Sequence, residues 1–165
     1  MMPVQKPGLS KQDYQTPKEF LAAVRLRLRI PFFDCDLAAD KDNRKSPVYF
    51  YDESTDALKQ HWRGLGDWLW LNPPYNNITP WVKKAGEESL GGAKIAVLIP
   101  ASVGANWWRD YVENSCYQLF LNGRITFEGC TTPYPKDCAL LLYTPYIRSG
   151  NCVWDWKKEF NNGIK

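Results

Sequence analysis

The run KIAVLIP, residues 94–100, constrains the fold more than any other stretch of the chain. An uninterrupted apolar run of this length is typical of a central strand in a parallel sheet, covered by other elements on both faces. Neighbouring parallel strands need long crossover connections, which are usually helices. The run therefore predicts an α/β protein built around this strand.

Helices and strands alternate along the rest of the chain. In TPKEFLAAVRLRLRI we expect Thr16 as the N-cap of a helix and Pro17 at its first helical position. Further helices are predicted at STDALKQHW (54–62, capped by Ser54, Thr55 or Asp56), TPWVKKAGEESL (79–90) and ANWWRDYVEN (105–114). Strands are predicted at FFDCDL (32–37), VYFY (48–51), WLWL (68–71), YQLFL (117–121) and CALLLY (138–143).

This alternation predicts a single domain with an open, mostly parallel sheet. The last two strands are separated by NGRITFEG, residues 122–129, which has the pattern of a turn and hairpin segment and indicates an antiparallel edge. Residues 1–13 are polar and are expected to form an N-terminal arm. Residues 14–144 hold the predicted domain, and residues 145–165 form a tail to which no structure is assigned.

Composition excludes some classes of protein. Hydrophobic residues make up 44% and aromatic residues 15% of the chain, which is typical of ordered globular proteins. A net charge of +3 tolerates a polyanionic partner without identifying one. The five cysteines form no C-x-x-C pair and His61 is the one histidine, so we expect reduced thiols, no metal, no membrane span and a cytoplasmic location.

The stretch DWLWLNPPYNN, residues 67–77, is the strongest functional signal. Pro73 and Pro74 cannot donate backbone hydrogen bonds, so the strand must end before them. The Asn72 side chain and the proline carbonyls offer acceptors suited to an NH2 group, and Tyr75 offers a ring on which a planar group can stack. Asparagine and proline also occur together in ordinary loops, so position decides between the readings. Ligands of such sheets bind at the carboxyl ends of strands, where NPPY and FDCDLAAD both lie.

NPPY after an apolar strand resembles the signature of amino-group methyltransferases that use S-adenosylmethionine. The segments YQTPKEF, FDCDLAAD, NPPYNNITPWVKKA, AVLIPASVGANWWRDYV, FLNGRITFEG and YPKDCALLLY, over residues 14–144, are similar to the small adenine-N6 DNA methyltransferases of bacteriophages and prophages. The glycine-rich cofactor loop of broader methyltransferases is replaced by DLAADKDN. The resemblance implies a Rossmann-like methyltransferase sheet that transfers the methyl group of S-adenosylmethionine to adenine N6 in double-stranded DNA.

The resemblance also implies roles for particular residues. The cofactor would be bound at Thr16, Pro17, Asp36, Ala38, Asp52, Asp56 and Asn72, with Asp52 or Asp56 accepting from the ribose hydroxyls. Catalysis would depend on Asn72, Pro73, Pro74 and Tyr75. A base flipped out of the duplex would stack on Tyr75, with Phe127 closing its other face or serving only in the core. Candidate phosphate contacts are Lys83 and Arg124, with Lys84 and Arg109 as further possibilities.

Two other functions fit the same pattern. A protein glutamine N5-methyltransferase uses NPPY on a side-chain amide, but such enzymes usually have a glycine-rich cofactor loop and a helical substrate domain. A catalytically silent nucleic-acid-binding module would keep the sheet and need not bind S-adenosylmethionine. The DNA recognition sequence and the oligomeric state stay open, and a phage-encoded protein would act in the cytoplasm of its bacterial host.

Overall fold

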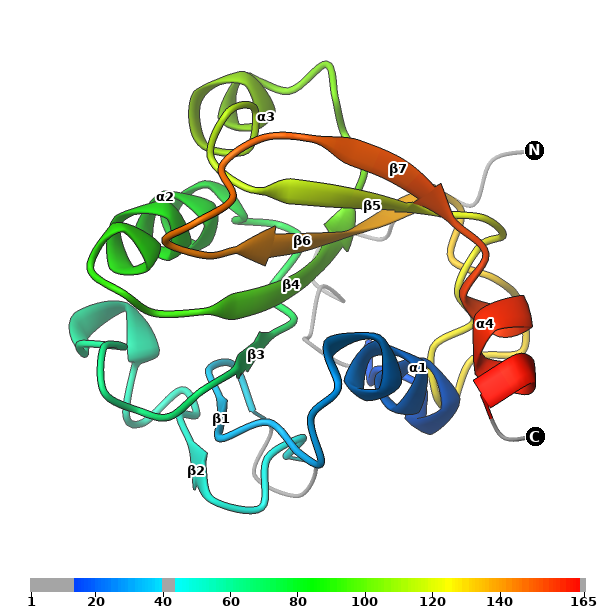
Figure 1. Ribbon diagram of the computed structural model, residues 1–165, viewed down its shortest axis with the longest axis horizontal. Helices are drawn as coiled ribbons and strands as arrows, with labels where there is room; N and C mark the ends of the chain where they lie inside the picture. Colours follow the sequence, from blue (N-terminus) through cyan, green and yellow to red (C-terminus); the bar gives the residue numbers. More distant parts are fainter. Residues whose placement is uncertain (1–13, 40–43, 164–165) are drawn as a thin grey trace.

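A seven-stranded sheet with strand order β2-β1-β3-β4-β6-β5-β7 forms the centre of the protein (Figure 1). The computed structural model describes residues 14–39 and 44–163, so the predicted N-terminal arm lies outside the described residues. The strands are β1 (Cys35–Asp36), β2 (Tyr49–Phe50), β3 (Leu69–Leu71), β4 (Ile95–Pro100), β5 (Tyr117–Leu121), β6 (Cys138–Tyr143) and β7 (Asn151–Trp154). The helices are α1 (Lys18–Leu28), the 3₁₀ turn η1 (Ala57–Lys59), α2 (Thr79–Leu90), α3 (Asn106–Tyr111) and α4 (Trp156–Gly163).

Most neighbouring strands run parallel. β2, β1, β3 and β4 pair in parallel, while β6 runs antiparallel to both β4 and β5. β7 continues the sheet beyond β5, to which it is parallel. The predicted α/β sheet, mostly parallel with antiparallel pairing among its later strands, is confirmed.

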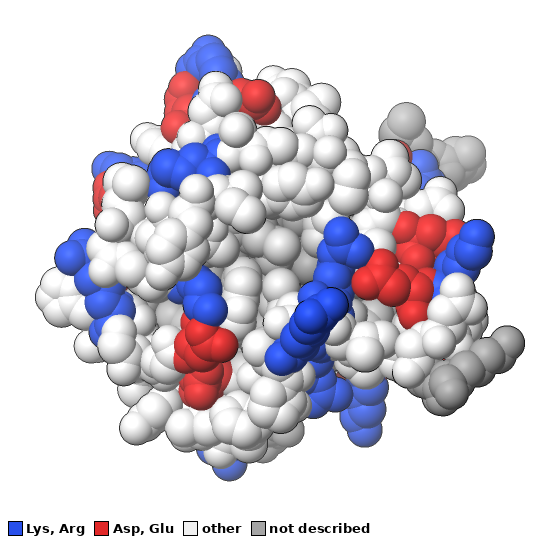
Figure 2. Space-filling model, in the orientation of Figure 1, with Lys and Arg blue, Asp and Glu red and all other residues white. Residues whose placement is uncertain are grey.

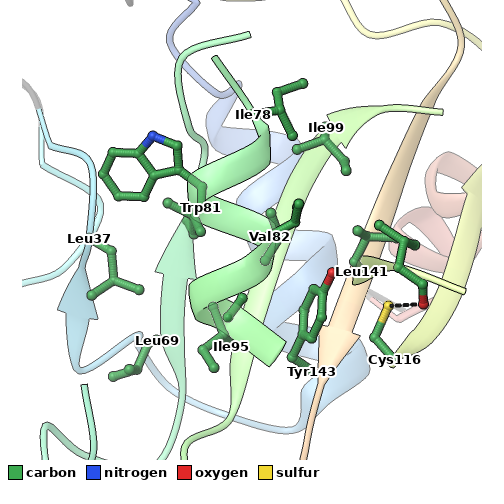
Figure 3. Close-up of a cluster of buried hydrophobic side chains, with 14 of the residues drawn as sticks. Leu37, Leu69, Ile78, Trp81, Val82, Ile95, Ile99, Cys116, Leu141 and Tyr143 are labelled. Atoms are coloured by element: carbon green, nitrogen blue, oxygen red, sulfur yellow. Dashed lines mark hydrogen bonds between the residues drawn. The ribbon is translucent and has the colours of Figure 1, made fainter. Parts of the chain in front are cut away.

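Helices cover both faces of the sheet, which explains why the sequence of β4 is apolar throughout. Ile95, Val97 and Ile99 pack in the cluster that includes α2 and α3, which Figure 3 shows in close-up. Ala96 and Leu98 point to the other face, into the cluster that includes α1 and α4. Every residue of β4 is buried, as expected for a strand with no face in water.

The tail beyond residue 144 completes the sheet and the α1 layer. β7 adds the edge strand, and α4 packs on α1 with the Trp156 ring 5.2 Å from the Phe20 ring. The Glu159 carboxylate accepts hydrogen bonds from the Arg27 guanidinium at 2.8 Å and from the Trp154 indole at 2.7 Å. The described part of the tail therefore belongs to the same packed unit.

The predicted start of the first helix is wrong by one position. The helix begins at Lys18, and Pro17 takes the N-cap position with an extended backbone (φ −60°, ψ 139°). The first helical turn closes through the Leu21 N–H to the Pro17 carbonyl at 3.1 Å. Thr16 does not cap the helix, because its buried hydroxyl accepts a hydrogen bond from Asn72 instead.

Other predicted elements are shorter than expected. Only Cys35–Asp36 of the segment FFDCDL pairs as a strand, and WLWL begins to pair at Leu69. The segment STDALKQHW forms a single 3₁₀ turn, capped by Asp56, with His61 exposed just beyond it. The segment NGRITFEG lies in the connection between the antiparallel strands β5 and β6, as predicted, but the connection is longer than a tight hairpin turn, and the segment's one isolated bridge among the described residues joins Glu128 to Gln15.

Candidate active site

The two strand ends selected from the sequence lie at one edge of the sheet. β1 and β3 are neighbours and run parallel, with Asp36 paired in register with Trp70, so Asp36 and Asn72 both lie at the carboxyl ends of adjacent strands. The segment that precedes α1, residues 14–17, reaches the same edge through its hydrogen bonds to Asn72. The ends of these two neighbouring parallel strands and residues 14–17 therefore lie at the same edge of the sheet.

Asn72 uses only one end of its amide. Its Nδ2 donates to the Tyr14 backbone carbonyl at 2.9 Å and lies 3.2 Å from the Thr16 hydroxyl. Its Oδ1 is buried and has no hydrogen-bond partner within residues 14–39 and 44–163. A buried acceptor without a donor typically costs about 1–3 kcal/mol. This oxygen is therefore a ready acceptor for a donor on a ligand.

The two prolines behave differently. The Pro74 carbonyl accepts a hydrogen bond from the Asn77 N–H at 3.3 Å, which closes a turn. No hydrogen bond to the Pro73 carbonyl is found in the described part of the chain. Of the two proline carbonyls, that of Pro74 is thus engaged in the turn, while that of Pro73, the residue after Asn72, accepts no hydrogen bond from the described residues.

Tyr75 belongs to a group of four aromatic side chains, which we call the aromatic cluster: Tyr14, Tyr75, Phe127 and Tyr134. The Tyr14 ring lies nearly parallel to the Tyr75 ring, with an interplanar angle of 21° and centroids 5.8 Å apart. Phe127 and Tyr134 approach Tyr75 edge-on at 6.2 and 5.6 Å. The Tyr75 hydroxyl lies 3.3 Å from the Leu98 carbonyl of β4, and burial raises the pKa of Tyr75 well above its usual value.

Two members of the aromatic cluster could not be predicted from the sequence. Tyr14 and Tyr134 both occur in segments on which the family resemblance rests, YQTPKEF and YPKDCALLLY, but no pattern around either residue indicates a ring at the site. Phe127 is buried and contacts all the other rings of the cluster. Its two predicted roles, in the core and beside a base, are therefore compatible in one position.

Asp36 is a buried carboxylate at the end of β1. Its oxygens accept hydrogen bonds from the backbone N–H groups of Lys45, at 2.7 Å, and Ala38, at 3.3 Å. Burial outweighs these bonds and raises the pKa of Asp36 to about 6. A buried acid with an elevated pKa at a strand end is a frequent feature of functional sites.

Asp52 and Asp56 are the two candidates for the ribose, and they differ in how many of their carboxylate oxygens already accept a hydrogen bond or an ion pair. Oδ1 of Asp52 accepts from the backbone and hydroxyl groups of Ser54 and Thr55, which lower the pKa of this carboxyl. Its Oδ2 receives no hydrogen bond from the described residues. Asp56 uses one oxygen for the Leu58 N–H at 3.2 Å and the other for Lys59 at 3.3 Å.

The candidate phosphate contacts are distributed around the molecule. Lys83 is exposed on α2, and Arg124 is exposed in the β5–β6 connection, 3.3 Å from Asp137. Lys84 binds the buried Glu88 at 2.9 Å, and Arg109 binds its neighbour Asp110 at 2.8 Å. In Figure 2, basic side chains gather over α1, whose last turn and C-cap contribute Arg25, Arg27 and Arg29.

No group of three or more His, Cys, Asp and Glu side chains in residues 14–39 and 44–163 is arranged to hold a metal ion. Among the helices of the same residues, none combines the length and apolar character needed to cross a membrane. All five cysteines are free thiols, and Cys35, Cys116 and Cys138 are buried among apolar side chains as expected.

A mostly parallel sheet with an Asn-Pro-Pro-Tyr turn at the carboxyl end of its inner strand β3 is consistent with the Rossmann-like methyltransferase class. Within that class, the chain belongs to the family described as DNA N-6-adenine-methyltransferase (Dam), whose family model matches residues 5–140.

Two phage proteins are among its relatives. The DNA N-6-adenine-methyltransferase of Escherichia phage T1 is 31% identical over 131 residues, which cover 79% of this chain and 53% of the relative. The protein of the same name from Haemophilus phage HP1 (strain HP1c1) is 30% identical over 107 residues, or 64% of this chain and 60% of the relative. The chain therefore matches just over half the length of each phage protein.

Proposed function

We propose that this protein transfers a methyl group from S-adenosylmethionine to N6 of an adenine flipped out of double-stranded DNA. The observation that carries the proposal is the Asn72 Oδ1, a buried acceptor without a donor among the described residues, at the start of the turn Asn72-Pro73-Pro74-Tyr75. The names of the family and of its phage members support the choice of adenine in DNA.

The chemistry needs two acceptors close to one amine. The lone pair of adenine N6 is conjugated into the ring, so the amine is a poor nucleophile. Hydrogen bonds from its two hydrogens to the Asn72 Oδ1 and the Pro73 carbonyl favour a more tetrahedral nitrogen and stabilise the positive charge that develops on it. S-adenosylmethionine would supply the methyl group to this nitrogen and leave as S-adenosylhomocysteine, and the methylated amine would release one proton to solvent.

The cofactor supplies the methyl group, and residues near the carboxyl ends of β1 and β2 would hold it. The buried Asp36 carboxylate would face its ammonium or ribose, with Ala38 in the turn beyond β1. We assign the ribose hydroxyls to Asp52, because its Oδ2 is open while both oxygens of Asp56 are in use. Thr16 and Pro17, just before α1, are suited to the methionine carboxylate because a helix N-terminus attracts anions.

The target base would stack on Tyr75, which offsets part of the few kcal/mol that base flipping costs. Phe127 would close the site from the side of the β5–β6 connection. In the free protein the Tyr14 ring lies against Tyr75, so this ring must shift when the base enters. Lys83 and Arg124 would contact phosphates, and the protein would act in the cytoplasm of a bacterial host.

Methyl transfer from labelled cofactor tests this function directly. The protein is incubated with double-stranded DNA or with a glutamine-containing peptide, and the DNA is digested to nucleosides for mass spectrometry. We expect N6-methyladenine in the DNA and no label in the peptide. Label in the peptide alone would favour the glutamine methyltransferase, and a folded protein that binds DNA without transfer or cofactor binding would favour the silent module.

A further inference from the structure

We propose that residues 14–16 are part of the catalytic centre, because they set the orientation of the Asn72 amide and so aim its Oδ1 at the substrate amine. Thr16 is then a positioning residue, acting through Asn72. The proposal rests on the proposed function, and it adds a role for a segment that lies more than fifty positions before Asn72 in the chain.

The Tyr14 backbone carbonyl decides which way the amide points. An asparagine amide has a donor end and an acceptor end of nearly the same shape, and a half-turn of the side chain exchanges them. A backbone carbonyl can only accept, and it lies 2.9 Å from the amide nitrogen. The reverse orientation would place two acceptors against each other, so the carbonyl holds Nδ2 toward itself and Oδ1 away.

Thr16 also favours this orientation of the Asn72 amide. Its hydroxyl oxygen lies 3.2 Å from the same nitrogen and its side chain is buried. The two hydrogens of Nδ2 thus face two acceptors, which restricts rotation of the amide. Because both partners are at the nitrogen, nothing in this network engages Oδ1.

The segment itself is held at both ends. The Gln15 carbonyl accepts from the Glu128 N–H at 2.9 Å, which ties the segment to the β5–β6 connection. The Pro17 carbonyl closes the first turn of α1. Tyr14 also packs its ring in the aromatic cluster. A segment held in this way can present its carbonyl and hydroxyl at fixed positions.

A purely structural asparagine would look different. Buried polar side chains usually pair all of their groups, yet within residues 14–39 and 44–163 the donor end of Asn72 has two partners and the acceptor end has none. The arrangement fixes a free acceptor in one direction. An acceptor that binds an incoming amine must be held in one orientation in this way.

The test compares Thr16→Val, which keeps the shape but loses the acceptor, with Thr16→Ser, which keeps the hydroxyl. In single-turnover methylation of DNA at saturating cofactor, we expect Thr16→Val to be slower by about tenfold, the upper range for losing one hydrogen bond. Thr16→Ser should stay within about twofold of wild type on the same argument. Thermal melts of both variants check that the fold is retained.

Two readouts separate positioning from cofactor binding. Calorimetry with S-adenosylhomocysteine sets the ligand concentration that saturates Thr16→Val, so that the loss of rate measured at saturation is not a loss of cofactor binding. In an Asn72→Ala background, Thr16→Val should slow the reaction no further, because the side chain through which it acts is gone. An unchanged single-turnover rate, or an additional loss of rate in the Asn72→Ala background, would overturn the proposal.

A third readout does not depend on activity. Hydrogen exchange of the Asn72 side-chain amide, followed by NMR in the free protein, should be several-fold faster in Thr16→Val than in wild type. Equal exchange would also overturn the proposal. Failure of the wild-type protein to make N6-methyladenine would instead count against the proposed function. The exchange measurement alone would then test whether Thr16 restrains the Asn72 amide.

Discussion

Replacing Asn72 with alanine should abolish most of the activity while changing stability little. The change removes the two hydrogen bonds of Nδ2, to Tyr14 at 2.9 Å and to Thr16 at 3.2 Å. At about 0.5–1.5 kcal/mol each, their loss costs roughly 1–3 kcal/mol. The change also removes the unpaired buried Oδ1, whose burial costs about as much.

These two contributions to the free energy of unfolding oppose each other. We therefore expect a net change of no more than about 1 kcal/mol, which shifts the melting temperature of a domain of this size by roughly 2–4 °C. The effect on the rate of methyl transfer has no opposing contribution. Losing a preorganised contact at the reacting group typically slows turnover by about a hundredfold or more.

The assay is single-turnover methyl transfer to DNA with labelled cofactor, accompanied by thermal melts and calorimetry with S-adenosylhomocysteine. Asn77→Ala is the matched control: Asn77 is exposed in the same loop, and its bond to Pro74 uses the backbone N–H, which alanine retains. The control should keep the wild-type rate. An Asn72→Ala protein that methylates DNA at the wild-type rate would show that the asparagine only terminates β3.

Three further outcomes follow from the same geometry. Tyr75→Phe should keep most of its activity despite losing its hydroxyl contact to the Leu98 carbonyl, whereas Tyr75→Ala should lose about fivefold or more in methylation rate, since stacking is worth about 1–3 kcal/mol per base; equal rates for the two variants would refute a stacking role. The affinity for S-adenosylhomocysteine should be constant above pH 7 and weaken as the pH falls through about 6, because the pKa of Asp36 is raised to about 6 and protonation removes the carboxylate that the ligand contacts. Calorimetry across this range should show no such dependence in Asp36→Asn, and a wild-type affinity that does not change with pH would place the cofactor elsewhere. DNA affinity, measured by fluorescence anisotropy, should fall linearly with salt on a log–log scale, and Lys83→Ala or Arg124→Ala should each reduce the slope by about 0.9; unaltered slopes would remove these side chains from the DNA interface.

Features that depend on short stretches of chain could be predicted from the sequence. The apolar run of β4 predicted a strand covered on both faces, and Thr79–Leu90 forms the predicted helix with both bounds as expected. The prolines after Leu71 ended β3 where predicted, and placed Asn72 at the sheet edge. Each of these follows from backbone rules that act over a few residues.

Contacts between distant segments were decided only by the tertiary structure. The sequence suggested Thr16 as a helix cap, because nothing local shows that its hydroxyl meets Asn72, 56 positions away. Likewise, the tail gave no clear local pattern, and α4 is held by contacts such as Arg27 with Glu159, 132 positions apart. Local propensity sets which elements form, but the partner of a buried polar group depends on how those elements pack. At Asn72, packing paired the amide nitrogen and left the oxygen without a partner among the described residues.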